Sequence, residues 1–174
     1  GAKPPLRIGL CLTPWWDHAQ PASRDAIAVA EKALSVDALV EGIDLSAFAE
    51  GVRLHAEIMA FEAAQTLASE LTAPPEGLSP VLRAMLVSGM RTDRASHRQN
   101  LRQAADLRDR IASLFDRYDL LLAPAAPGEA PTGLGATGDP IFSRLWSLLH
   151  LPAITLPGFT GPAGMPVGIQ LLAG

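Results

Sequence analysis

Cysteine, lysine and long apolar runs are all scarce in this sequence. Cys11 is the one cysteine among 174 residues, so no disulfide can close within the chain, and we expect a reducing, cytoplasmic setting. No uninterrupted apolar stretch approaches the roughly 18 residues of a membrane span, and no secretory signal is visible, so we expect no membrane association. Lys3 and Lys32 are the two lysines, and the absence of a Gly-x-Ser-x-Gly elbow argues against hydrolases of that type.

Charged residues are also few, and they thin out towards the end of the chain. They make up 18% of the sequence against 48% hydrophobic residues, a balance typical of a folded globular protein. The net charge of −4 gives no support to a nucleic-acid partner. From Pro140 onward Arg144 is the only formally charged residue, which indicates the interior of a sheet. The length predicts a single α/β unit over residues 1–174.

Short apolar runs, most of them bounded by proline or glycine, predict the strands. The expected strands cover residues 6–12, 38–43, 120–123, 153–156 and 167–172, and the last three are expected to be fully buried. Apolar periodicity and capping residues predict helices over residues 21–34, 45–71, 80–87, 93–117 and 140–149. The first strand, helix and strand predict parallel pairing through a right-handed crossover. The fold class is therefore α/β, with a layered sheet of about five strands flanked by helices.

Two patterns suggest ligand sites, and both also have a simpler interpretation. Residues 133–138 match the dinucleotide fingerprint G-x-G-x-x-G, but they do not follow a predicted strand directly, and no acidic residue follows Asp139. Those glycines are better explained as turns in a loop. His55 and Glu62 share one face of the helix over 45–71, but two ligands without a His-Glu-x-x-His motif are weak evidence for a metal. We expect neither a metal nor a cofactor.

Three blocks of the later sequence resemble the amidase signature family. They are residues 118–124 (YDLLLAP), 146–157 (WSLLHLPAITLP) and 164–172 (GMPVGIQLL). Their order and spacing match the family, and residues 6–10 and 55–62 agree more loosely. The resemblance implies that the chain is part of the family's α/β/α fold, which holds a mixed or parallel sheet between helices.

The resemblance also implies an activity, hydrolysis of linear carboxylic amides by a Ser nucleophile, a second Ser on a cis peptide and a Lys. No Gly-Gly-Ser-Ser-Gly segment is present here, and neither Lys3 nor Lys32 sits in a matching context. We therefore expect no catalytic residue in this chain, which resembles the later portion of an amidase and is predicted to be inactive alone. Its partners would be a small-molecule amide substrate and the missing N-terminal portion. Without that portion, an apolar sheet edge should be exposed and favour self-association.

The same resemblance predicts which residues form the substrate-pocket wall. Ligands of open α/β sheets gather beyond the carboxyl ends of strands, so Pro124, Ala125, Pro127 and Trp146 are the predicted substrate-binding residues. Trp146 is equally well explained as a core residue. Ala125 replaces the family's usual Thr or Ser and removes a hydroxyl from the pocket. His150 replaces a usual Gly and would be strained if that position needs a positive φ.

Two other functions stay open at this stage. The chain could be a non-catalytic binding or scaffold protein that reuses the fold, or a nucleotide-binding α/β domain. Saturable amide turnover would separate an enzyme from a scaffold. A nucleotide that raises the melting temperature would support the nucleotide-binding interpretation.

Overall fold

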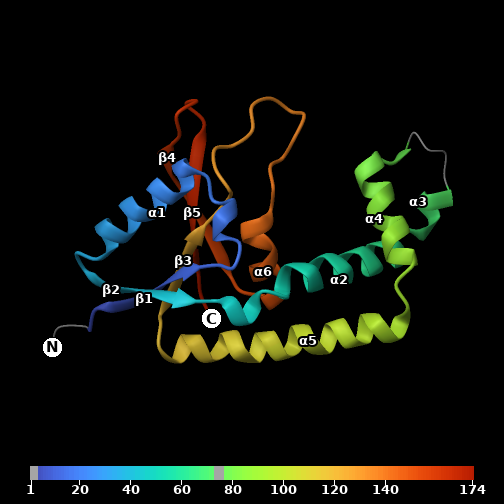
Figure 1. The fold of residues 1–174 in the computed structure, drawn as a ribbon, viewed down its shortest axis with the longest axis horizontal. Helices are drawn as coiled ribbons and strands as arrows, with labels where there is room; N and C mark the ends of the chain where they lie inside the picture. The colour runs from blue at the N-terminus through green and yellow to red at the C-terminus, as the bar shows by residue number, and fades with distance from the viewer. Residues whose placement is uncertain (1–3, 73–76) are drawn as a thin grey trace.

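The computed structural model describes residues 4–72 and 77–174. Five strands form one sheet in the order β2-β1-β3-β5-β4 (Figure 1). They are β1 (Leu6–Leu12), β2 (Ala38–Asp44), β3 (Leu120–Pro124), β4 (Ala153–Thr160) and β5 (Pro166–Leu172). All five predicted strands are present, and β4 continues past its predicted end at residue 156.

The sheet is mixed. β1 runs parallel to β2 and to β3, with Leu6 opposite Ala38 and Ile8 opposite Leu120. β5 is antiparallel to both of its neighbours, β3 and β4. Helix α1 (Pro21–Leu34) connects β1 to β2, which confirms the predicted parallel pairing across a helical connection. The predicted α/β class with a layered mixed sheet is likewise confirmed.

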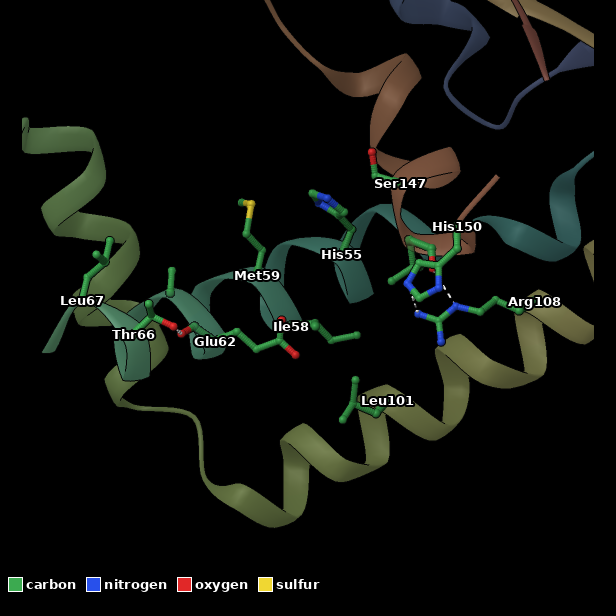
Figure 2. Close-up of a pocket in the computed structure, with 12 residues that line it drawn as sticks. His55, Ile58, Met59, Glu62, Thr66, Leu67, Leu101, Arg108, Ser147 and His150 are labelled. Carbon is green, nitrogen blue, oxygen red and sulfur yellow. Dashed lines mark hydrogen bonds between the residues drawn. The ribbon is translucent and has the colours of Figure 1, made fainter. Parts of the chain in front are cut away.

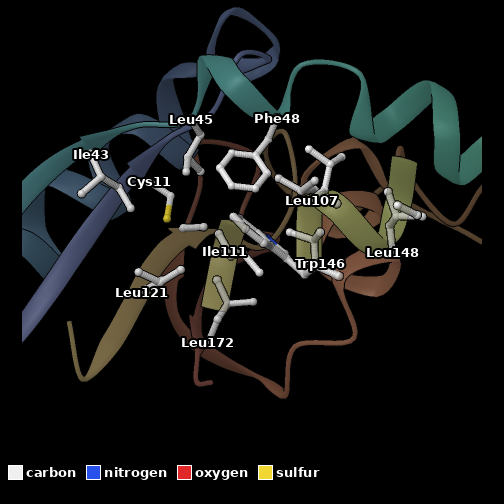
Figure 3. Packing of buried hydrophobic residues seen from close by; sticks show 14 of the residues in the cluster. Cys11, Ile43, Leu45, Phe48, Leu107, Ile111, Leu121, Trp146, Leu148 and Leu172 are labelled. Carbon is white, nitrogen blue, oxygen red and sulfur yellow. The ribbon is translucent and has the colours of Figure 1, made fainter. Parts of the chain in front are cut away.

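Helices cover both faces of the sheet. Consecutive strand residues point to opposite sides, so neighbouring residues of one strand pack in different clusters. On β3, Leu122 belongs to a buried cluster that includes Ala26 and Ile27 of α1. Its neighbour Leu121 belongs to the larger cluster on the other face, which is built with the longer helices and contains Ile111. Figure 3 shows this larger cluster around Trp146. The result is a helix–sheet–helix arrangement.

The remaining helices follow the predicted order with different bounds. They are α2 (Gly51–Thr66), α3 (Ala68–Thr72), α4 (Pro80–Met90), α5 (Arg94–Ala112) and α6 (Ile141–Leu149), with 3₁₀ helices at Trp16–His18, Ser46–Phe48 and Ser113–Asp116. α2 packs against α4, α5 and α6, and α5 runs below α2 in Figure 1. Asp93 caps α5, accepting hydrogen bonds from the N–H groups of Ala95 and Ser96. Within residues 4–72 and 77–174, no helix is long and apolar enough to cross a membrane.

The prediction of one continuous helix over residues 45–71 is wrong. The Asp44 carboxylate accepts hydrogen bonds from the Ser46 N–H and hydroxyl, which forms a local side-chain-to-backbone turn at the start of this segment. A 3₁₀ helix follows, and α2 begins at Gly51. At the other end, Leu67 has φ −105° and ψ 29°, outside the helical region, so α2 and α3 are separate. The predicted helix over 93–117 similarly ends in a 3₁₀ helix.

The prediction that residues 153–156 form a fully buried strand is also wrong for this chain. β4 is an edge strand, paired only with β5, and its residues are exposed except for the half-buried Phe159. Ile154 is 60% exposed and Leu156 is 40% exposed. The run is apolar as expected, but burial requires a second layer or a second neighbour. In contrast, the central strand β3 is buried as predicted.

Candidate functional site

A cavity of about 430 Å³ lies where β3 ends and the chain enters its Pro/Gly-rich loop. Its walls are the loop that begins at Ala125, the start of β5, part of β4, and Gln20 before α1. Gly168 contributes to the tight fit, because a Cβ built there would lie 3.0 Å from Cγ2 of Thr155 and 3.3 Å from Cβ of Ala125. The cavity therefore sits beyond the carboxyl end of a central strand, where α/β sheets commonly bind ligands.

Main-chain hydrogen bonds fix the loop that walls this cavity. The Ala125 N–H donates to the Gly168 carbonyl oxygen at 3.1 Å, which extends the β3–β5 pairing by one step. The Gln20 N–H donates to the Pro127 carbonyl oxygen at 2.6 Å, and the Ser23 hydroxyl donates to that of Ala126 at 2.9 Å. The wall is thus held from two sides, by β5 and by the start of α1.

Glu129 joins the same loop to the turn between β4 and β5. Its Oε1 accepts hydrogen bonds from the N–H groups of Ala163, at 2.9 Å, and Met165, at 3.1 Å. The side chain lies against Gly161, where a Cβ would overlap it. Glu129 is half-buried and lines the cavity. The Glu129 carboxylate therefore links the loop after β3 to the turn between β4 and β5.

Gln170 connects the end of β3 to α6 underneath the cavity. Its Nε2 donates to the carbonyl oxygens of Pro124, at 2.6 Å, and Phe142, at 2.9 Å. Gln170 is buried inside β5, so these two acceptors would be without its donor if the side chain were apolar. No role for Gln170 was predicted from the sequence. The available signal was a single amide side chain within a strand that is otherwise apolar.

The four predicted wall residues occupy two different positions. Ala125 and Pro127 line the cavity. Pro124 is buried directly below it, with its carbonyl oxygen bound by Gln170. Trp146 is only 2% exposed and packs in the larger core cluster beside the sheet. Among the described residues its indole N–H has no hydrogen-bond partner. Trp146 is thus a core residue here, and contact of any of the four with a substrate remains a prediction.

A second, more open cavity of about 690 Å³ lies between α2, α5 and α6 (Figure 2). His55 and Glu62, the pair considered as metal ligands, both line it. The part of the chain that the structure describes contains no group of three His, Cys, Asp or Glu side chains able to hold a metal ion. Burial lowers the pKa of His55, and the positive charge of Arg144 on α6 adds to the shift. His55 therefore lies at the boundary between α2 and α6.

His150 closes α6 in the left-handed conformation, with φ 60° and ψ 30°. The condition stated for this position, a positive φ, is therefore met, and a non-glycine residue is expected to be strained there. The Leu151 N–H donates to the Trp146 carbonyl oxygen, which completes the helix end. The His150 ring lies 3.1 Å from an Nη of Arg108, and that guanidinium also donates through Nε to the Leu148 carbonyl oxygen (Figure 2).

The glycine motif at residues 133–138 does not have the surroundings of a dinucleotide site. β3 ends at Pro124 and α6 begins at Ile141, so the motif neither follows a strand directly nor opens a helix. Residues 131–140 are all exposed. Gly133 and Gly138 have φ values of 77° and 85°, which is the use expected of glycines in turns.

Comparison with known proteins gives one consistent family. The family model described as Amidase matches residues 1–174. AtzE, a 1-carboxybiuret hydrolase subunit of Pseudomonas sp. (strain ADP), is 30% identical over 97% of this chain. A glutamyl-tRNA(Gln) amidotransferase subunit of Neisseria meningitidis serogroup C (strain 053442) is 44% identical over 37% of the chain and 15% of its own length.

Solved structures agree with this result. A crystal structure of an amidase superposes with a TM-score of 0.83 at 26% identity and covers 99% of this chain. The shared region is 42% of that amidase and 39% of the Pseudomonas hydrolase protein. The chain therefore spans well under half the length of these relatives.

Proposed function

This chain belongs to the amidase family, and we propose that it supplies sheet core and substrate-pocket wall for the hydrolysis of linear carboxylic amides. The cavity beyond the carboxyl end of β3 is the observation that carries the proposal. Two of the predicted wall residues, Ala125 and Pro127, line it, whereas Pro124 and Trp146 are buried and do not. Its substrate would be a small-molecule amide.

We further propose that the chain hydrolyses nothing by itself. The family mechanism needs a Ser nucleophile, a second Ser and a Lys, and the sequence carries no Gly/Ser-rich double-serine segment. Lys32 is exposed on α1, and Lys3 lies outside the described residues. Ser23 already donates its hydroxyl to the Ala126 carbonyl oxygen. The catalytic groups would come from an N-terminal portion of the same enzyme, in a cytoplasmic setting compatible with the single buried Cys11.

The test compares residues 1–174 alone with the longer protein encoded by any reading frame upstream of Gly1. Ammonia release from a panel of linear amides is measured for both. We expect no turnover by the chain alone and saturable turnover by a longer protein that carries the two serines and the lysine. Saturable turnover by residues 1–174 would contradict the proposal.

Measurements of amide binding and of melting temperature on the same proteins separate the alternatives. A longer protein that binds amides without releasing ammonia would indicate a non-catalytic binding protein built on the same fold. A nucleotide that raises the melting temperature, where amides do not, would favour nucleotide binding.

A further inference from the structure

The ionisable side chains that line the cavity at the end of β3 carry one sign of charge. Among the residues that the structure describes there, Glu129 and Asp139 are the two ionisable ones, and neither Lys, Arg nor His is present. Arg24, which follows Gln20 in the first part of α1, donates instead to the carbonyl oxygens of Ala19 and Trp16. Thus no cation offsets the two carboxylates at the cavity wall.

Glu129 is half-buried at this wall. Its Oε1 is bound by two backbone N–H groups, which orient the carboxylate without neutralising it. The ion pairs found within residues 4–72 and 77–174 involve other carboxylates. Asp139 is similarly bound by the N–H of Ile141 at the start of α6. An anion entering the cavity would therefore meet the half-buried Glu129 carboxylate and the exposed Asp139 carboxylate, with no cation in the lining beside them.

The rest of the wall offers apolar surface and neutral polar groups. Ala125, Pro127 and Val167 present carbon atoms, while Gln20 and Thr155 bring neutral hydrogen-bonding side chains. Such a lining suits a short aliphatic or amine-bearing group and offers a carboxylate no cation with which to pair.

We propose that this cavity accepts the uncharged or positively charged portion of the substrate and rejects a carboxylate. The inference rests on the proposed function, since it assigns a charge class to the substrate of the same site. Rejection comes from like charge, which is a common route to specificity.

The test uses three ligands of similar length that differ in terminal charge: hexanamide, 6-aminohexanamide and 5-carbamoylpentanoate. Residues 1–174 are titrated with each, and the backbone amide shifts of Ala125, Glu129 and Gly168 report binding in the cavity. We expect the carboxylate to bind about tenfold more weakly than hexanamide, with a smaller difference at high salt. Equal or tighter binding of the carboxylate, or no binding of any of the three, would overturn the inference.

The Glu129→Gln variant separates charge from loop positioning. The Gln Oε1 can accept the same two backbone N–H bonds but carries no charge. We expect E129Q to bring the carboxylate within about threefold of hexanamide. Asp37→Asn, at an exposed carboxylate between α1 and β2, is the matched control and should leave the ratio unchanged. A ratio unaltered by E129Q would overturn the inference.

Binding does not depend on turnover, so the two proposals can fail separately. If the carboxylate is rejected but the longer protein hydrolyses no amide, the proposed function fails and the charge preference of the cavity stands as a binding property. If amides are hydrolysed and the carboxylate is preferred, the function stands and this inference fails.

Discussion

The left-handed backbone of His150 is a local strain at the end of α6. With φ 60°, the Cβ of a non-glycine residue crowds its own carbonyl oxygen. Two contacts offset part of this cost: the helix-closing hydrogen bond of Leu151 and the approach of Arg108 to the imidazole. Glycine, which has no Cβ, should therefore be more favourable than histidine at position 150.

We expect His150→Gly to raise the free energy of unfolding by about 0.5–1 kcal/mol, because relief of the strain exceeds the loss of the Arg108 contact and the added freedom of the unfolded chain. Urea denaturation followed by circular dichroism measures the change. His18→Gly is the control: His18 has no positive φ, so this variant should lose stability. A His150→Gly protein less stable than the parent would contradict the argument.

Gln170 shows the opposite situation, in which a polar side chain is required inside the core. Both of its acceptors, the carbonyl oxygens of Pro124 and Phe142, lie in buried surroundings. We expect Gln170→Leu to lower the free energy of unfolding by about 2–3 kcal/mol, since two buried acceptors lose their donor. Gln99→Leu, on the exposed face of α5, should change it by less than about 0.5 kcal/mol. Equal effects in the two variants would rule out the proposed role.

At the scale of elements, the boundary between α2 and α6 should respond to pH. Burial, followed by the positive charge of Arg144, lowers the pKa of His55 below its ordinary value, so the folded protein binds this proton less readily than the unfolded chain. The stability that neutral His55 contributes is complete above its unfolded pKa and is lost as pH falls from there through its lower folded pKa. We therefore expect the free energy of unfolding to fall between pH 7 and pH 5.

Urea denaturation at several pH values checks this expectation. His55→Gln should flatten the fall, because no proton is then taken up at this position on unfolding. Arg144→Met should reduce it partly, since burial remains when the charge is gone. An unchanged slope in His55→Gln would assign the pH dependence to other groups.

The elements predicted most accurately from sequence were those whose ends are marked by nearby proline or glycine residues. β1, α1 and β5 begin or end near proline or glycine, and their predicted limits agree closely with the structure. The separate 3₁₀ helix after Asp44 was not predicted. Apolar periodicity does not register the hydrogen bond that the Asp44 carboxylate accepts from the Ser46 N–H. In the site, Ala125 and Pro127 followed from their place after a strand. The role of Glu129 depends on a turn more than thirty residues away and could not be read locally.

At the scale of the whole molecule, the exposed edge of β4 is the feature most open to association. No residue of Ala153–Thr160 is charged, and its backbone groups on one side have no strand beside them in the described sheet. Edge strands without charges invite pairing with another strand. The prediction that β4 is buried was wrong, because an apolar strand sequence does not reveal whether a second strand or a helix covers the strand.

We expect residues 1–174 to self-associate through this edge in a concentration-dependent manner. Ile154→Lys should reduce the association, because a charge on the edge opposes strand pairing. Static light scattering over a range of micromolar concentrations measures it. Val36→Lys, at a residue that is 79% exposed between α1 and β2, is the control and should have no effect. A parent protein that stays monomeric throughout would contradict the expectation.

The strand order has a consequence for how the molecule is made. β5 lies between β3 and β4, although it follows both in the chain. During synthesis, β1, α1, β2 and β3 can assemble as they emerge, but β4 has no partner within the described sheet until β5 has also left the ribosome. Chains fold from the N-terminus as they are translated, so a nascent chain passes through a stage in which β4 is complete and unpaired. During that interval the uncharged strand β4 is open to a chaperone that binds unpaired apolar segments.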